Sequence, residues 1–238
     1  MDDSDPFTYA HRLPTPSRPL LGLTILVVED SRYASEAMRL ICLRSGARIR
    51  RADCLKSARR HLQIYRPSVV VVDLGLPDGS GLDLIRELSA ASPRVGIILA
   101  TSGDDNCEED ALSAGADGFL AKPLTSLTSF QNEVLSRLPE DRRPPGPRLI
   151  SEEPIHPDDL AFRDDLAHAA DVLEAGEDAT LDYVAQFIGG VARSAHDTIL
   201  AQAAADLASA RAAGTPGTAV AARIAGLVQE RLDQKRAI

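Results

Sequence analysis

The chain has 238 residues, and its hydrophobic content of 44% can supply the cores of two small domains. With 35 acidic and 26 basic side chains its formal charge is −9, which disfavours general binding of nucleic acid or anionic membranes. No apolar stretch reaches the length of a membrane span. Three cysteines, Cys42, Cys54 and Cys107, lack metal-ligand spacing. We therefore expect a soluble cytoplasmic protein with free thiols.

Residues 1–21 contain several prolines and no hydrophobic period, which predicts a mobile N-terminal arm. From 22 to 138, short β-type runs alternate with helical patterns, which predicts an α/β domain. Its fold would be a doubly wound five-stranded parallel sheet, with strand carboxyl ends along one edge. The predicted strands are Thr24–Val28, Arg48–Arg51, Val69–Val72, Val95–Ala100 and Gly118–Ala121. The predicted helices are Arg32–Arg44, Leu55–Tyr65, Gly81–Ala90, Asp105–Ala114 and Ser126–Leu138.

A proline-rich linker is predicted over residues 139–157, because this segment cannot sustain a helix. Residues 158–238 are rich in alanine and carry apolar residues at helical spacing, which predicts a small all-α bundle of three or four helices. Breaks in the helical pattern are expected at Gly176, at Gly189–Gly190 and at 214–217.

Ionisable and hydroxyl side chains follow four of the predicted strands. Asp73 ends the valine-rich third strand, Glu29 and Asp30 end the first, Thr101 ends the fourth and Lys122 ends the fifth. Three carboxylates at one edge of a sheet repel one another unless a cation neutralises them, and oxygen ligands favour Mg²⁺. A carboxylate beside Mg²⁺ and an ammonium group is equipped to attack a phosphoryl donor. The expected product is an aspartyl phosphate.

Five short motifs around these residues occur in order at matching element positions. They are Leu26–Asp30, Val72–Asp73 with Pro77–Gly81, Ala100–Gly103, Gly115–Phe119 and Ala121–Pro123. Over residues 22–138 the chain therefore resembles a response-regulator receiver domain of two-component signalling, with the flavodoxin-like fold of that family.

The resemblance implies that Asp73 is the phosphoacceptor and that a sensor histidine kinase or a histidine phosphotransfer protein is the donor. It implies that Mg²⁺ is held by Asp30, Asp73 and the backbone carbonyl of Gly75, and by Glu29 through water. Lys122 would contact the acyl phosphate.

The same resemblance implies a cis bond between Lys122 and Pro123, which would aim the lysine inward. Thr101 and Phe119 would form a switch pair that reports phosphorylation. Phe119 lacks the polar tip of the tyrosine or histidine often found at this position, so burial alone would hold its inward rotamer.

A basic cluster surrounds the predicted second strand and helix, while residues 151–238 hold 15 acidic and 7 basic side chains. Such a cluster can be a solvated face, or it can be a docking surface for the acidic C-terminal part of the chain. Both interpretations stay open. The cluster consists of Arg44, Arg48, Arg50, Arg51, Lys56, Arg59, Arg60 and Arg66.

The segment from Ala185 to Ser194, followed by Ala203–Ala208, resembles more weakly the central hairpin of a histidine phosphotransfer bundle. In that family the phosphoryl-carrying histidine would fall at Gln186 and its lysine partner at Gly189. Because glutamine cannot carry phosphate as an imidazole does, relay through position 186 is not expected. The alternative is a generic bundle that dimerises or binds a downstream protein.

Three functions are compatible with these patterns. The first is a response regulator that accepts a phosphoryl group on Asp73, acts through protein contacts and is no enzyme beyond its own phosphorylation and dephosphorylation. The second is a phosphorylation-controlled DNA-binding regulator, which the acidity of residues 151–238 disfavours. The third is an aspartyl-phosphate hydrolase, a class that commonly has an aspartate where this chain has Gly75.

Overall fold

The computed structural model describes residues 13–147, 153–175 and 180–234. Five parallel strands form one sheet in the order β2-β1-β3-β6-β7, and a hairpin of β4 (Gly75–Leu76) and β5 (Gly79–Ser80) lies in the loop after β3. This confirms the predicted fold class. The five strands are β1 (Thr24–Val28), β2 (Arg48–Ala52), β3 (Val69–Asp73), β6 (Ile97–Ser102) and β7 (Gly118–Ala121).

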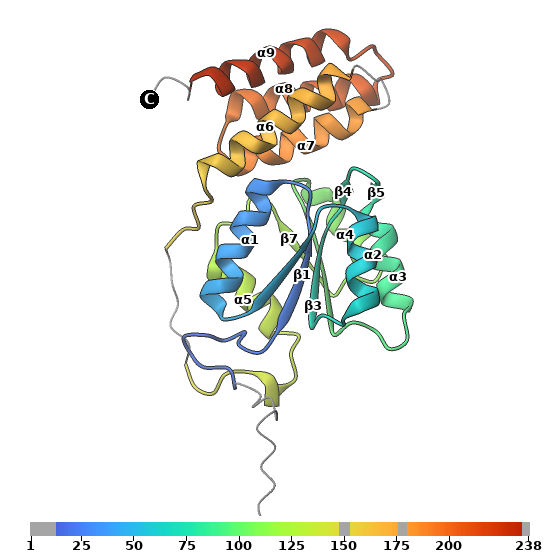
Figure 1. Ribbon diagram of the computed structural model, residues 1–238. Helices are drawn as coiled ribbons and strands as arrows, with labels where there is room; N and C mark the ends of the chain where they lie inside the picture. The colour runs from blue at the N-terminus through green and yellow to red at the C-terminus, as the bar shows by residue number, and fades with distance from the viewer. Residues whose placement is uncertain (1–12, 148–152, 176–179, 235–238) are drawn as a thin grey trace, which may run out of the picture.

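Helices cover both faces of this sheet (Figure 1). α1 (Arg32–Ser45) and α5 (Leu127–Leu135) pack on one face, and α2 (Leu55–Ile64), α3 (Gly81–Ala90) and α4 (Glu108–Ser113) pack on the other. Two short 3₁₀ turns complete this part of the chain: η1 (Asp105–Cys107) precedes α4, and η2 (Glu140–Arg142) follows α5. A side-chain period of two divides each strand between two cores: Val69 and Val71 face α1, whereas Val70 and Val72 face α3.

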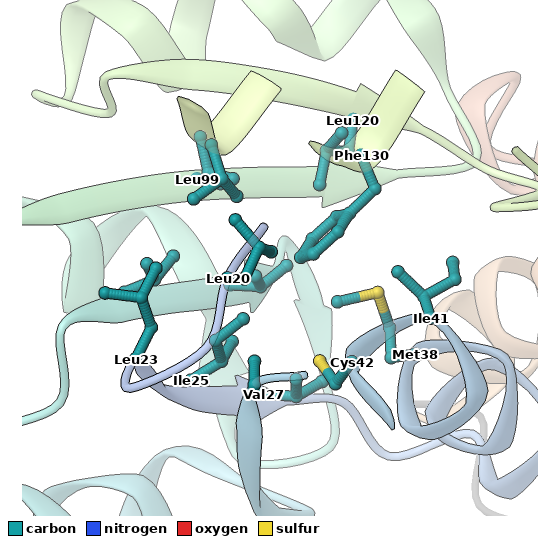
Figure 2. Close-up of a cluster of buried hydrophobic side chains, with 14 of the residues drawn as sticks. Leu20, Leu23, Ile25, Val27, Met38, Ile41, Cys42, Leu99, Leu120 and Phe130 are labelled. Carbon is teal, nitrogen blue, oxygen red and sulfur yellow. The ribbon is translucent and has the colours of Figure 1, made fainter. Parts of the chain in front are cut away.

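The first core extends beyond the predicted domain boundary (Figure 2). Leu20 is completely buried beside Ile25 and Phe130, and its backbone N–H donates to the carbonyl of Ser45 at 2.9 Å. The prediction of a mobile arm over residues 1–21 is therefore wrong at its end, because an apolar side chain among the prolines completes the core. The remainder of that arm, residues 1–12, lies outside the described residues.

The C-terminal half contains α6 (Asp159–Glu174), α7 (Leu181–Ser194), α8 (Thr198–Ala212) and α9 (Thr218–Gln234), here called the helical bundle. Its core is formed by apolar residues of all four helices, including Leu166, Ile188, Leu207 and Ile224. Within the residues that are described, no helix is both long and apolar enough to cross a membrane.

The break expected at Gly189–Gly190 does not occur, because α7 runs through both glycines. A Cβ at Gly189 would lie at an ordinary contact distance of 3.6 Å from the Cβ of Ala204, and its nearest neighbour would be a guanidinium nitrogen of Arg193 at 3.2 Å. Burial of the apolar side of α7 in the bundle core, with Val184, Ile188 and Val191, outweighs the low helix propensity of glycine. The break expected at Gly176 falls outside the described residues.

Candidate functional site

Glu29, Asp30, Asp73, Thr101 and Lys122 meet at the carboxyl ends of the strands, and we call this group the acidic edge. Parallel pairing places Asp73 directly beside Thr101, and β1, which precedes Glu29 and Asp30, is the other neighbour of β3. Carboxylate oxygens of Glu29, Asp30 and Asp73 all lie within 4.8 Å of one another. The sheet topology thus brings together groups from distant parts of the chain.

Lys122 links two of these carboxylates. Its Nζ lies 2.6 Å from Oε2 of Glu29 and 2.8 Å from Oδ2 of Asp73, and its side chain is only 7% exposed. Burial lowers the pKa of Lys122, but the charges of Asp73 and Glu29 outweigh burial and hold the pKa above its usual value. The lysine is therefore an ammonium group that donates to both acids. Its peptide bond to Pro123 is cis.

The remaining negative charge at the acidic edge is not balanced by this one ammonium group. Burial and the charge of Asp73 raise the pKa of Glu29 well above its usual value, although Lys122 opposes the shift. Burial and Asp73 also raise the pKa of Asp30 to about 7, against a hydrogen bond from Tyr183. The three carboxylates repel one another when all are ionised. A divalent cation such as Mg²⁺, which prefers carboxylate oxygens as ligands, would offset this repulsion and favour their charged forms.

Thr101 lies beside Asp73 on the neighbouring strand β6, and Phe119 lies on β7, the next strand of the sheet. The buried Oγ1 of Thr101 donates to the backbone carbonyl of Leu120 at 2.8 Å. Phe119 is half-buried on β7 and packs against the second core. The backbone N–H of Gly75 donates to Oδ1 of Asp73 over a long 3.4 Å. All residues that the sequence assigns to the receiver-like site therefore lie at or next to the acidic edge.

Two contacts at this edge come from Tyr183 and Asp165 of the helical bundle, which the sequence analysis did not single out. The phenol of Tyr183 on α7 donates to Oδ2 of Asp30 at 2.7 Å. Burial and the charge of Asp30 raise the pKa of Tyr183, so the phenol stays protonated and able to donate. On α6, the carboxylate of Asp165 accepts from Oγ of Ser31 at 2.7 Å, next to the acidic edge.

Beside these contacts, a cleft of about 1030 Å³ lies between the acidic edge and helices α7 and α8 of the bundle. Its walls carry Asp73 and Lys122 on one side and Gln186 and Arg193 of α7 on the other. The cleft offers a small molecule a path to Asp73 while a helix of the same chain stands opposite. Figure 1 shows the bundle stacked over this end of the sheet.

The bundle does not dock on the basic cluster of the second strand and helix. It packs instead on α1 and on the β4 loop. Within that cluster, Arg59 pairs with Glu87 on α3, and Arg44 pairs with Glu153 of the linker, at 3.3 Å between exposed side chains. The docking hypothesis was therefore wrong for the bundle helices, whose buried hydrogen bonds lie at the start of α1. The acidic segment touches the cluster through the exposed pair of Arg44 and Glu153.

Comparison with known proteins identifies the first half of the chain. Residues 25–131 match the family model of the response regulator receiver domain. The KDP operon transcriptional regulatory protein KdpE of Escherichia coli is 33% identical over 100 residues, which cover 42% of this chain and 44% of KdpE. The Probable transcriptional regulatory protein TcrX of Mycobacterium tuberculosis is 32% identical over 161 residues, 67% of this chain and 65% of TcrX. This chain thus spans less than two thirds of either relative.

A solved two-component response regulator from Clostridium difficile is 20% identical, with a TM-score of 0.44, and the match covers 48% of this chain and 94% of that one. The family match, the relatives and the order of the motifs agree on the class. Residues 25–131 belong to the response-regulator receiver domains of two-component signalling.

Proposed function

We propose that this protein is a response regulator that takes a phosphoryl group from a phosphohistidine donor onto Asp73 in a Mg²⁺-dependent reaction and signals through protein contacts. The observation that carries this proposal is the cluster of three carboxylates within 4.8 Å of one another, with Lys122 bonded to two of them. The donor would be a sensor histidine kinase or a histidine phosphotransfer protein. Beyond its own phosphorylation and dephosphorylation, the protein would be no enzyme.

In the proposed reaction a carboxylate oxygen of Asp73 attacks phosphorus, the P–N bond of the phosphohistidine breaks and the imidazole leaves with the bonding electron pair. Lys122 sits 2.8 Å from Asp73, where its ammonium group can neutralise charge on the transferring oxygens. Asp30, Asp73 and the backbone carbonyl of Gly75 would hold Mg²⁺, with Glu29 bound through water, and the ion would neutralise the same oxygens.

Thr101 and Phe119 would convert phosphorylation into a change of shape. A phosphoryl oxygen on Asp73 offers the Thr101 hydroxyl a stronger acceptor than the carbonyl of Leu120, to which it now donates. Withdrawal of the threonine would open space for the ring of Phe119. The surface around β7 would then be read by a downstream protein or by a second copy of the chain.

The test is labelling of the full-length protein by acetyl phosphate in the presence of Mg²⁺. We expect one acid-stable, alkali-labile phosphoryl group per chain, which disappears in Asp73→Asn and when EDTA removes the metal. Asp83→Asn is the matched control, because Asp83 is an exposed acid on α3 that pairs with Arg86 away from the acidic edge. Stoichiometric labelling of Asp73→Asn would refute the proposal.

A second candidate is phosphorylation-controlled DNA binding, because KdpE and TcrX are both transcriptional regulatory proteins by name. Against it, residues 151–238 carry 15 acidic and 7 basic side chains, a net charge of −8. A salt-dependent mobility shift of duplex DNA by the phosphorylated protein would favour this candidate, since phosphate contacts make DNA binding weaken with salt.

A further inference from the structure

The helical bundle is hydrogen-bonded to the receiver domain at the start of α1. Asp165 is 2% exposed, and its carboxylate accepts from Oγ of Ser31 at 2.7 Å and from the backbone N–H groups of Arg32 at 2.7 Å and Tyr33 at 3.0 Å. The first N–H groups of a helix have no partner within the helix and favour a negative charge. An acid of the bundle therefore caps a helix of the receiver domain.

Apolar contacts support this cap. The ring of Phe162 on α6 meets that of Tyr33 edge-on, with centroids 5.8 Å apart. In the linker, Ile155 is 3% exposed in the first receiver core, and its N–H donates to the carbonyl of Thr125 at 3.2 Å. The linker and α6 together hold the bundle in one position over the acidic edge.

In this position one face of α7 lines the cleft next to Asp73. Tyr183 contacts Asp30, and Gln186 lies against Gly75, where a Cβ would come within 2.1 Å of its Nε2. One turn further on, Gly190 lines the same cleft. The side chain at position 186 thus stands beside the loop that follows Asp73.

A phosphohistidine on another protein must reach Asp73 from the same direction. The places beside Gly75 and Asp30 that a donor helix would need are already filled by Gln186 and Tyr183 of α7. A small phosphodonor fits the cleft, because pockets for such molecules range from ~300 to ~1000 Å³. A helical donor and the docked bundle therefore exclude each other.

We propose that the bundle occupies the docking place of the phosphohistidine donor, with α7 presenting position 186 to Asp73 as a donor helix would present its imidazole. This inference rests on the proposed function of Asp73. Gln186 has no group that can carry phosphate, so the docked bundle cannot donate, and it keeps a protein donor away until it is released.

The geometry can be tested within the chain itself by restoring an imidazole with Gln186→His. Once Asp73 is labelled by acetyl phosphate, the neutral imidazole attacks phosphorus and a P–N bond forms. The P–O bond breaks, its electron pair returns to the carboxylate of Asp73 and the second ring nitrogen releases its proton to water. We expect acid-labile, alkali-stable phosphohistidine to appear at position 186, with a first-order rate independent of protein concentration.

Matched variants separate this transfer from other labelling. Gln202→His makes the same substitution on the exposed side of α8, away from the cleft, and should give no phosphohistidine. Adding Asp165→Ala or Tyr183→Phe to Gln186→His should slow transfer at least tenfold, because the first removes three hydrogen bonds that dock the bundle and the second removes one. Hydrogen exchange at the amides of Arg32 and Tyr33 should become faster in Asp165→Ala.

The outcomes distinguish the two proposals. If acetyl phosphate does not label Asp73, the proposed function fails. If Asp73 is labelled but Gln186→His forms no phosphohistidine, or forms it at a rate proportional to protein concentration, the placement of α7 is refuted and the function of Asp73 stands. Equal labelling of Gln202→His would also refute the placement.

Discussion

Asp30 differs from the other two carboxylates of the acidic edge in its partners. Lys122 lies between Glu29 and Asp73, whereas Asp30 accepts a hydrogen bond from the phenol of Tyr183. A neutral phenol stabilises the ionised carboxylate less than an ammonium group does. Burial and the charge of Asp73 therefore dominate, and they raise the pKa of Asp30 to about 7.

This pKa predicts a pH dependence of stability in metal-free buffer. Because the folded-state pKa of Asp30 exceeds its unfolded value of 3.8, the folded protein binds the proton more tightly. The stabilisation is complete below pH ~4 and is lost as the pH rises through about 7. Asp30→Asn should remove this loss and be more stable than wild type at pH ~8 by ~1–3 kcal/mol. Urea unfolding in EDTA at pH ~5 and ~8 measures the free energy of unfolding of the wild type and of Asp30→Asn. If both proteins showed the same pH dependence, the raised pKa of Asp30 would be contradicted.

Thr101 gives a second prediction at this scale. Its buried hydroxyl satisfies the carbonyl of Leu120 at 2.8 Å. Thr101→Val keeps the shape but leaves that carbonyl without the hydroxyl, so we expect a loss of ~1–2 kcal/mol in the free energy of unfolding. Thr101→Ser retains the hydroxyl and should lose less. Denaturant titration of both variants provides the comparison, and equal stabilities would show that this hydrogen bond contributes nothing.

Among the elements, α3 and α7 use glycine for different reasons. Gly81 begins α3 directly after the loop of the acidic edge, and a Cβ there would lie 2.0 Å from the backbone carbonyl oxygen of Asp73. In α7 a Cβ at Gly190 would meet no atom within 4 Å. The first glycine permits the chain to pass close to the backbone of Asp73, while the second leaves space in the cleft.

These surroundings predict opposite effects of the same substitution. Gly190→Ala should stabilise the protein by ~0.5–1 kcal/mol, because alanine loses less backbone entropy in a helix than glycine does. Gly226→Ala in α9 should behave alike, since its Cβ position is also open. Gly81→Ala should destabilise strongly, because the backbone of Asp73 has to move. Thermal unfolding followed by circular dichroism compares the three; a stable Gly81→Ala protein would contradict the close approach.

In the whole molecule, buried contacts join the receiver domain to the helical bundle, and the ion pairs between them are exposed. Asp165 and Ile155 are 2% and 3% exposed. The pair Arg32–Asp164 has side chains that are 66% and 40% exposed, and exposed pairs of this kind contribute little. Polar caps and apolar packing, rather than opposite net charges, therefore hold the two halves together.

The docked arrangement should consequently resist salt. We expect the radius of gyration from small-angle X-ray scattering to stay the same between ~0.1 M and ~1 M NaCl, although the Debye length falls from ~10 Å to ~3 Å. Ile155→Asp should expand the molecule, because it places a charge in the receiver core. Ile199→Asp is the matched control, since Ile199 is 62% exposed. Expansion of the wild type at high salt would show that charge attraction holds the bundle.

Local patterns were enough to predict the receiver half. The valine run before Asp73 and the breakers after it act over a few residues, and parallel strands bring their carboxyl ends to one edge, so Glu29 and Lys122 could be assigned to the site without coordinates.

The docking of the bundle at the start of α1 had no such signal in the sequence. Asp165 lies 134 positions from Ser31, and neither residue differs in type from many ordinary surface or capping residues. Hydrogen bonds at this separation depend on how two finished domains pack, and no period or motif in the chain encodes that contact. The same holds for the helical state of Gly189 and Gly190, which the apolar face of α7 packed in the bundle core supports against their own low helix propensity.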